Sequence, residues 1–406
     1  MKRIIIIFIF CVSLISSSLF GQWPLGKGVE WYIEGPKKNW TKRDHDRYYR
    51  WRDRLSASRK AEIADEQILP RQKAILNGNK ITTEIWNYGS ISSPGNRVTD
   101  IVWETLGYGY EFGPFICAKV PIESGHHQDA FYEIVDGDTN WYANMISDGL
   151  TSLGGEVSPD GLEFYGWEPL AFNDDFTVPY GDPNSENIPT SNDLDRDGDG
   201  KPDSWPFGWY NSNLKDYVWP GALRQGASNS DLESFFVVDD RTNKEFQYYP
   251  FTSDSSKRGL GIEIESRYYQ WANPLAEDII FLIYKVTNKS DKDLEDVTFG
   301  MWGDPHVGGP SNWQDDLSFF DQNLNMVYCW DADGISDVTG RPPGYFGYKF
   351  LESPGQPYDG IDNDGDGLID ERQDNGIDED GDWNVEKHDV GTVSYTHLTL
   401  PTNREV

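Results

Sequence analysis

Two aspartate-rich runs hold the residues of this chain whose types and spacing could do chemistry. Each run places carboxylates at loop positions 1, 3, 5 and 9 and a glycine at position 6. The carboxylates are those of Asp195, Asp197, Asp199, Asp203, Asp362, Asp364, Asp366 and Asp370. Calcium takes roughly six to eight hard oxygen ligands, and this spacing wraps a loop around one ion, with the position-7 carbonyls of Lys201 and Leu368 as further ligands. The runs therefore predict two calcium sites, and an acidic loop without an ion is the alternative for each.

Both runs differ from the EF-hand. The bidentate glutamate of position 12 is missing, since Pro206 and Gln373 stand there, and no helices flank the loops. The runs resemble the short Asp-rich repeats of dockerins and of thrombospondin type 3 arrays, and this resemblance implies that their aspartates bind calcium. A third run, Asp378 to Asp382, repeats the second at a shift of 16 residues, but Trp383 replaces its glycine, so its ability to bind an ion stays open.

The composition excludes some classes of partner. There are 35 Lys and Arg against 68 Asp and Glu, which gives a formal net charge of −33. Such a field repels nucleic acid and anionic lipid and attracts divalent cations, so the sequence predicts no nucleic-acid partner. The chain also holds 16 Trp and 22 Tyr, for which we expect a place in sheet cores, with stacking against sugars as the alternative.

The first residues predict the compartment. Lys2 and Arg3 precede an apolar run over 4–15 that is too short to span a bilayer, and small residues follow up to Gly21. We read residues 1–21 as a signal peptide, which predicts a secreted or cell-surface protein exported through the periplasm. No later segment reaches membrane-spanning length. The remaining cysteines, Cys117 and Cys329, either pair in an oxidising compartment or stay as free thiols.

The longest stretch with clear β periodicity runs from Gly259 to Asp304. Ile280, Leu282, Tyr284 and Val286 alternate on one face, and a polar turn separates them from a second alternating run that ends near Trp302. This pattern predicts an antiparallel meander within a β-sandwich. We therefore expect a mainly β chain with one or two antiparallel sandwiches, an N-terminal helical arm and a C-terminal Asp/Gly-rich calcium-binding segment.

The predicted segments follow one another along the chain as a signal peptide, an arm, a β-rich region, a calcium-loop insertion, a sandwich core and Asp-rich repeats. Their residue ranges are 1–21, 22–76, 77–192, 193–204, 205–352 and 353–391. Within the arm the pattern predicts a helix over about 42–67, and Pro70 either ends it or separates it from a short second helix near 71–76. Strands are further expected over 81–86, 98–103, 114–120, 131–135, 162–165, 234–238, 245–251, 326–330 and 345–350.

The last residues, 393–406, break abruptly with the acidic run before them. They resemble the translated sequencing-adapter tail found at the end of many metagenomic gene models. We therefore expect them to be foreign to the natural chain, which would then be longer than this fragment. A native terminal strand is the alternative.

Several further stretches carry a wider resemblance. They are Asn77 to Ser90, Gly107 to Pro114, Tyr217 to Asp240, the meander, and Gly344 to Gly367. The chain is similar in these stretches to the amino-terminal part of large, uncharacterised secreted proteins of gram-negative environmental bacteria, which commonly end in a type IX secretion sorting domain. The resemblance implies secretion, but no catalytic residues.

The sequence contains no hydrolase, zinc-protease or nucleotide-binding fingerprint. His126 with His127, and Asp304 with His306, lack a third metal ligand at a fixed spacing, so a polar loop is favoured for each. We therefore expect a calcium-stabilised surface or matrix protein with a structural and adhesive role, and favour a non-enzymatic one. The alternative is an extracellular polysaccharide-active enzyme or carbohydrate-binding module. The partners to expect are polysaccharides or other surface proteins.

Overall fold

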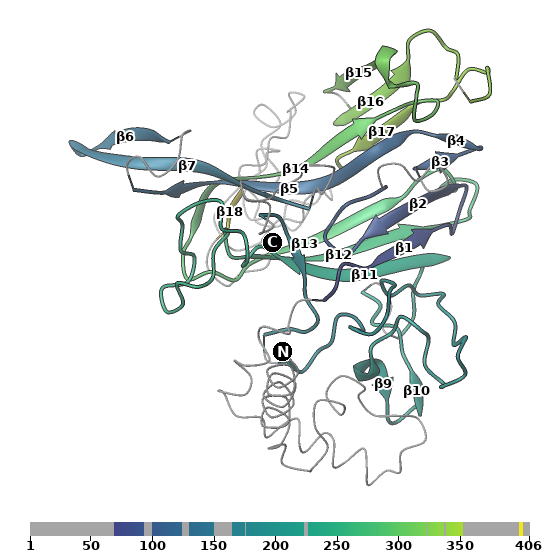
Figure 1. Ribbon diagram of the computed structural model, residues 1–406, viewed down its shortest axis with the longest axis horizontal. Coiled ribbons are helices and arrows are strands. Elements are labelled where there is room, and N and C mark those ends of the chain that lie inside the picture. The colour runs from purple at the N-terminus through teal and green to yellow at the C-terminus, as the bar shows by residue number, and fades with distance from the viewer. Residues whose placement is uncertain are drawn as a thin grey trace, which may run out of the picture. The chain divides into compact units, whose positions relative to one another are not determined.

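The chain forms two compact units. The computed structural model describes residues 69–92, 100–123, 130–149, 165–174, 176–222, 226–322, 324–336 and 338–351 and the backbone of 398–400 (Figure 1). The first unit comprises Met1–Pro70 and Leu170–Asn229, and the second comprises Arg71–Pro169 and Ser230–Val406. The predicted signal peptide, the helix over 42–67, and the second and third aspartate runs lie outside the described residues.

The second unit is built from antiparallel strands. One sheet has the order β1-β2-β3-β4, a second β13-β12-β11-β8, a third β18-β14-β5-β7-β6 and a fourth β15-β16-β17. The bounds of the strands of the first two sheets are Lys73–Leu76 (β1), Ile81–Trp86 (β2), Val102–Trp103 (β3), Leu106–Gly107 (β4), Glu168–Pro169 (β8), Leu232–Asp239 (β11), Ile262–Gln270 (β12) and Phe281–Asn288 (β13). Those of the other two are Gly109–Pro121 (β5), Phe131–Val135 (β6), Asp138–Asp148 (β7), Leu294–Pro305 (β14), Asp316–Asp321 (β15), Met326–Asp331 (β16), Phe346–Lys349 (β17) and Leu398–Leu400 (β18).

The mainly β, antiparallel character predicted from the sequence is confirmed, but the sandwich is not. The sheets of the second unit have a propeller-like arrangement rather than two stacked layers. The meander shows where the prediction fails. Strands β11, β12 and β13 are consecutive antiparallel neighbours, but β14 leaves them and pairs with β5, from Glu295 opposite Lys119 to Pro305 opposite Gly109. Alternation along a strand indicates its buried face, but not the sheet that it joins.

The segment near 71–76, predicted as a short helix, is strand β1. It pairs with β2 from Lys73 opposite Trp86 to Leu76 opposite Thr83. Ala74 and Leu76 are buried, whereas Lys73 and Ile75 are exposed, which is the period of a strand. The turn around Gly78 joins β1 and β2, and a Cβ on Gly78 would lie 2.5 Å from that of Leu232. The helix prediction was wrong because the apolar pattern was too short to separate the two periods.

The predicted strand over 245–251 is also wrong. Phe246 and Tyr248 are buried at 5% and 3% exposure, with Gln247 exposed between them. The alternation is therefore real, but this backbone belongs to no strand. Alternating burial alone does not form a sheet ladder. Conversely, β7 and β15 were missed, while the predictions for 81–86 and 131–135 match β2 and β6.

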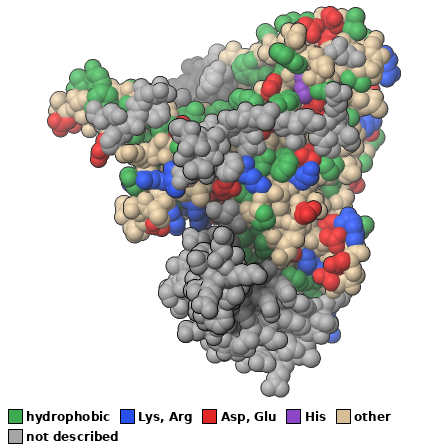
Figure 2. Space-filling view, in the orientation of Figure 1, with side chains coloured by type: hydrophobic (Ala, Val, Ile, Leu, Met, Phe, Trp, Pro, Cys, Tyr) green, Lys and Arg blue, Asp and Glu red, His purple; other side chains and the backbone are tan. Residues whose placement is uncertain are grey.

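The hairpin of β6 and β7 extends to the left in Figure 1. Its turn residues Asp136 and Gly137 have φ of +55° and +90°, the backbone that an Asp-Gly hairpin turn requires. Tyr132 and Ile134 are 57% and 69% exposed, and hydrophobic side chains gather at this end of the molecule (Figure 2). The apolar alternation of β6 is thus not matched by burial.

The first unit is held by three tryptophans. The ring centroids of Trp205, Trp209 and Trp219 lie 5.3–5.6 Å apart, and all three side chains are buried. A 3-10 helix, η1 (Phe207–Trp209), leads into the short pair β9 (Tyr210–Asn211) and β10 (Asp216–Tyr217). Tyr210 and Tyr217 lie opposite each other, and their rings are 5.3 Å apart. The first aspartate run precedes this cluster directly in the chain.

Strand β18 lies within the tail that resembles adapter sequence. Its backbone pairs with β14 at two points, Leu398 opposite Val297 and Leu400 opposite Leu294. The expectation that residues 393–406 are foreign to the natural chain stays a prediction. Within the described part of the chain, no helix has the length and apolar content needed to cross a membrane.

Candidate metal centre

The first aspartate run brings three carboxylates to one point. Oxygen atoms of Asp195, Asp197 and Asp203 lie within 4.8 Å of one another, and they belong to positions 1, 3 and 9 of the predicted loop. Asp199, at position 5, is not in this group. Its Oδ1 accepts a hydrogen bond from the backbone N–H of Lys201 at 2.8 Å. A metal ion could therefore be held by three of the four carboxylates predicted for this loop.

The loop keeps this shape through bonds from its own backbone. The two carboxylate oxygens of Asp195 accept from the N–H of Gly198 at 2.6 Å and of Gly200 at 2.8 Å. Both glycines have positive φ, +79° and +91°. A side chain would strain this backbone, so glycine is required at each turn of the loop. Asp197 is fixed in the same way, since its Oδ1 accepts from the N–H of Asp199 at 3.0 Å.

Lys201 anchors the loop through its side chain. The sequence predicts only its carbonyl as a ligand, and the structure adds a buried ammonium. Its Nζ donates to the Asp182 carboxylate at 2.9 Å and to the carbonyls of Trp205 at 2.8 Å and Asp203 at 3.3 Å. Only 7% of the Lys201 side chain and 6% of the Asp182 side chain are exposed. The bond to the Trp205 carbonyl therefore ties the loop to the tryptophan cluster, and the ion pair with Asp182 is shielded from solvent.

Arg196 places the positive charge of its exposed guanidinium beside two carboxylates of the loop region. Its Nη1 lies 2.8 Å from Asp193 Oδ1 and 2.9 Å from Asp203 Oδ2, and its N–H donates to Asp203 Oδ1 at 3.0 Å. These bonds, the backbone one first, lower the pKa of Asp203. Burial acts to raise the pKa of Asp193, but hydrogen bonds from Ser204 and Arg196 outweigh it and lower that pKa. Both carboxylates are thereby kept ionised.

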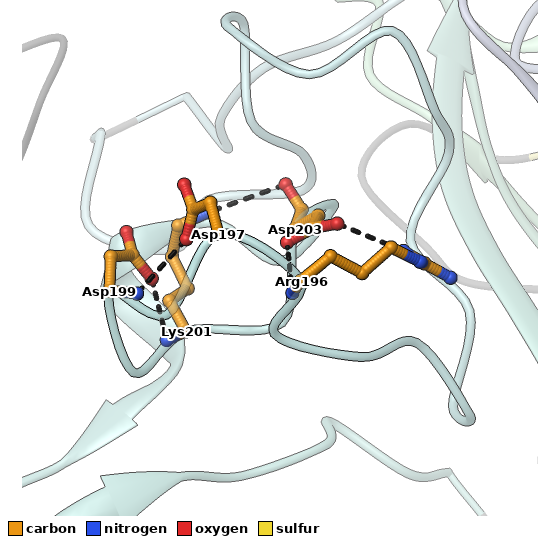
Figure 3. A pocket seen from close by; sticks show the side chains of 5 residues that line it. All are labelled: Arg196, Asp197, Asp199, Lys201 and Asp203. Atoms are coloured by element: carbon orange, nitrogen blue, oxygen red, sulfur yellow. Dashed lines mark hydrogen bonds and ion pairs between the residues drawn. The ribbon is translucent and has the colours of Figure 1, made fainter.

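A cavity of about 380 Å³ opens beside the loop. It is lined by Arg196, Asp197, Asp199, Lys201 and Asp203 (Figure 3). The side chain of Arg196 extends away from Asp197 and Asp199, on the other side of Asp203. The carboxylates of Asp197 and Asp199 therefore border the cavity on the side away from the guanidinium, together with Lys201. This arrangement suits a hydrated divalent cation.

A second aspartate group was not predicted from the sequence. Oxygen atoms of Asp315, Asp331 and Asp333 lie within 4.8 Å of one another. Asp315 ends the 3-10 helix η2 (Trp313–Asp315), Asp331 ends β16, and Asp333 follows in the next turn. The antiparallel pairing of β15 with β16, which sets Asp316 opposite Asp331, brings the two segments together.

Protein donors hold the carboxylates of this group. Asp331 is 7% exposed and accepts from the Asn312 amide, from the N–H of Gly334 and, at 3.1 Å, from the N–H of Ile335. Asp315 Oδ2 accepts from the N–H of Asp333 at 3.1 Å. No side chain of Lys or Arg is among these donors.

Asp316 shows the electrostatic cost of this arrangement. Its Oδ2 accepts from the N–H of Val307 at 2.8 Å, whereas its Oδ1 is buried without a hydrogen-bond partner. Burial, followed by the charges of Asp331 and Asp315, raises the pKa of Asp316 to about 6. Burial and the same neighbouring charges, of Asp315 and Asp331, raise the pKa of Asp333 as well. A cation here would relieve this repulsion.

The sequence signal for this group was weak. Asp331, Asp333 and Gly334 form only the short pattern D-x-D-G, and Asp315 lies 16 residues before Asp331. Loop spacing finds ligands that are adjacent in the chain, but this group depends on strand register. Residues 362–370, which hold the second predicted loop, lie outside the described residues, as do His126 and His127.

Other polar side chains singled out in the sequence have local roles. His306 Nε2 lies 2.6 Å from Asp100 Oδ2, and both residues are buried. Asp100 Oδ1 also accepts from the Ser92 hydroxyl at 3.1 Å.

The cysteines Cys117 and Cys329 are free thiols, and burial raises the pKa of each. Neither cysteine belongs to the two aspartate groups.

Comparisons with protein-family models, with curated proteins and with solved structures find no match for this chain. No family is therefore assigned to the chain.

Proposed function

We propose that this chain is a secreted, calcium-stabilised surface or matrix protein, with a structural and adhesive role. One observation carries the calcium part of this proposal. The carboxylates of Asp195, Asp197 and Asp203 converge within 4.8 Å on a loop whose backbone is already held in a wrapping shape. The Asp315, Asp331 and Asp333 group offers a second place for an ion.

The donor set favours a hard cation such as calcium over metals that prefer nitrogen or sulfur ligands. Every side chain in the two groups is a carboxylate, and neither group contains histidine or cysteine. Zinc, copper and nickel prefer nitrogen and sulfur ligands, while calcium prefers hard oxygens and, unlike magnesium, tolerates irregular geometry. The net charge of −33 also concentrates divalent cations near the surface.

The proposed role of the ion is to stiffen the chain. The first loop is a long irregular connection that precedes the tryptophan cluster, and the second group joins the ends of η2 and β16. An ion in the first loop fixes a segment that belongs to no strand, and an ion in the second group ties the turn after β16 to the end of η2. It binds only the folded chain, so it stabilises that state by mass action.

Calcium titration of the full chain tests this proposal. We expect dissociation constants of about 10⁻⁴ to 10⁻³ M, the range of extracellular modules. Calcium at ten times the dissociation constant should raise the free energy of unfolding by about 1.4 kcal/mol for each site. Isothermal titration calorimetry and thermal unfolding with and without a chelator measure both quantities.

Variants assign the sites. The pair Asp195→Asn and Asp203→Asn should remove one site, and Asp315→Asn with Asp333→Asn another. The pair Asp364→Ala and Asp366→Ala should remove the site predicted for the second run. Asp138→Asn, an exposed carboxylate of β7, is the matched control. Absence of calcium uptake would refute the proposal, and calcium-dependent release of sugars from a polysaccharide panel would support the enzyme alternative instead.

A further inference from the structure

The sheet of β15, β16 and β17 has two faces of different character. One face packs against β5, since the rings of Phe346 and Tyr348 lie 4.8 Å and 6.2 Å from that of Phe112. Cys329, on the same face, is buried. The other face carries large apolar side chains that are not buried. Phe319 is 52% exposed and Tyr345 is 72% exposed.

The strand register orders this second face into rows. Phe319 lies opposite Tyr328, and Leu317 opposite Trp330. Tyr345 precedes β17 by one residue and lies on the same face as Gly347, which is paired with Tyr328. A last row ends the apolar part and holds Asp321, Met326 and Lys349. We call the side chains of Leu317, Phe319, Tyr328, Trp330 and Tyr345 the aromatic face.

The rings of the aromatic face form one connected surface. The ring centroids of Phe319 and Tyr328 are 5.8 Å apart, and those of Tyr328 and Trp330 are 5.7 Å apart. Tyr345 lies 6.1 Å from Tyr328 and 6.3 Å from Trp330. The planes of Trp330 with Tyr328 and with Tyr345 are inclined by only 37° and 36°. The five side chains thus form one continuous apolar surface that is partly open to solvent.

We propose that the aromatic face binds a neutral polysaccharide chain. A sugar ring has an apolar side of C–H groups and a rim of hydroxyls. The C–H groups are attracted to the electron-rich face of an aromatic ring, and the flat contact excludes water. The rings of Phe319, Trp330 and Tyr345 supply such contacts over several sugar units.

At the end of the aromatic face that lies away from the second aspartate group, the charges favour a neutral ligand. Asp321 and Lys349 lie in the same row across the sheet, and their formal charges cancel. The carboxylate accepts hydrogen bonds from hydroxyls and the ammonium donates to them, so this row matches the rim of an uncharged sugar. A net charge of −33 on the whole chain repels anionic polymers.

This proposal goes beyond the calcium role, because none of the five side chains belongs to either aspartate group. A second copy of the chain is the other occupant that an apolar face of this kind could take. The two occupants have different signatures. Sugar binding retards the chain in a gel that contains polysaccharide, whereas self-association changes its mass with concentration.

Affinity electrophoresis of the full chain tests the proposal. The gels contain hydroxyethyl cellulose, xylan or galactomannan as neutral probes and alginate as an anionic one. We expect retardation by at least one neutral polymer and none by alginate. Phe319→Ala with Tyr345→Ala should raise the apparent dissociation constant at least tenfold, and Tyr345→Phe should leave it unchanged. Tyr132→Ala, which removes a tyrosine ring that is 57% exposed on β6, is the control.

Circular dichroism and analytical ultracentrifugation of every variant complete the test. Both changed side chains are exposed, so the double variant should keep its fold. Equal retardation of the double variant and the parent chain would overturn the proposal, and so would the absence of retardation by every neutral polymer. A monomer–dimer equilibrium that the double variant abolishes, without retardation by sugar, would assign the face to a second copy instead.

Discussion

At the residue scale, two basic side chains contact the first aspartate loop from different positions and have different roles. Lys201 is buried and its ammonium binds the carbonyls at the end of the loop, whereas Arg196 is exposed and binds Asp203. One cation therefore supports the fold of the loop, and the other lies on a candidate metal ligand. Substitutions of the two residues should have different effects.

The substitution Lys201→Met should destabilise the first unit. It removes the ammonium from the buried Asp182 carboxylate and from the carbonyls that the ammonium binds. Breaking a buried ion pair by removing one partner costs about 3 kcal/mol. Urea unfolding monitored by tryptophan fluorescence measures the loss. The double variant Lys201→Met with Asp182→Leu should recover part of it, and no recovery would show that the pair is not the cause.

The substitution Arg196→Met should strengthen calcium binding to the first loop severalfold. It frees the Asp203 carboxylate from the guanidinium, while the backbone N–H of residue 196 still orients Oδ1. Calorimetric titration measures the change, with Lys215→Met in the β9–β10 turn as a control for net charge. Weaker binding than in the parent chain would show that Arg196 organises the ligands rather than competing for them.

At the element scale, two glycines determine how closely β14 and β5 approach. Gly300 lies opposite Phe115 and Gly303 opposite Phe112. A Cβ on either glycine would lie 2.5 Å or less from the opposing ring. The rings therefore cover the glycine positions, which compensates for the missing side chains in the strand.

The substitution Gly303→Ala should lower the free energy of unfolding by about 1–3 kcal/mol, the range for overpacking. The added methyl group meets the Phe112 ring at 2.3 Å, and that ring already contacts Phe346. Thermal unfolding measures the effect. Gly137→Asn is the control, since its Cβ meets nothing within 4 Å and asparagine tolerates positive φ.

The strands and loops also show which features of the fold and of the candidate site can be predicted from the sequence. Short runs of strand-forming residues next to turn residues predicted β2 and β6 with their observed ends, because both signals are local in the chain. The short D-x-D-x-D-G run predicted the loop that brings Asp195, Asp197 and Asp203 together for the same reason. The propeller-like arrangement of the sheets, where the sequence predicted a sandwich, and the group of Asp315 with Asp331 could not be predicted, because strand pairing and sheet arrangement depend on residues far apart in the chain.

At the scale of the whole molecule, buried carboxylates should govern how stability varies with pH. Asp239 is buried, and burial raises its pKa to about 7 although Arg241 lies against it. Burial also raises the pKa of Asp240. An aspartate in the unfolded chain has a pKa of about 3.9. Between these values the folded chain holds a proton that the unfolded chain has released.

Stability should therefore fall as pH rises from about 4 to about 7 and then level off. The lowered pKa values of Asp193 and Asp203 act in the opposite sense, but only in acid below the usual aspartate range. Asp239→Asn should make the decline shallower and raise the melting temperature at pH 7.5 by a few degrees. Melting curves over this range measure it, with Asp138→Asn as control. An unchanged slope would mean that Asp239 is ionised throughout.

The buried ammonium of Lys201 has a consequence for the speed of ion exchange. The inner side of the loop already holds a positive charge that is covalently part of the chain, so its curvature exists before any ion arrives. Entry of calcium then needs loss of water from the ion and a shift of Arg196, but no folding step. Preorganisation of this kind removes the ordering cost from the binding event. The first loop should thus respond to changes in calcium concentration as a rapid, reversible buffer.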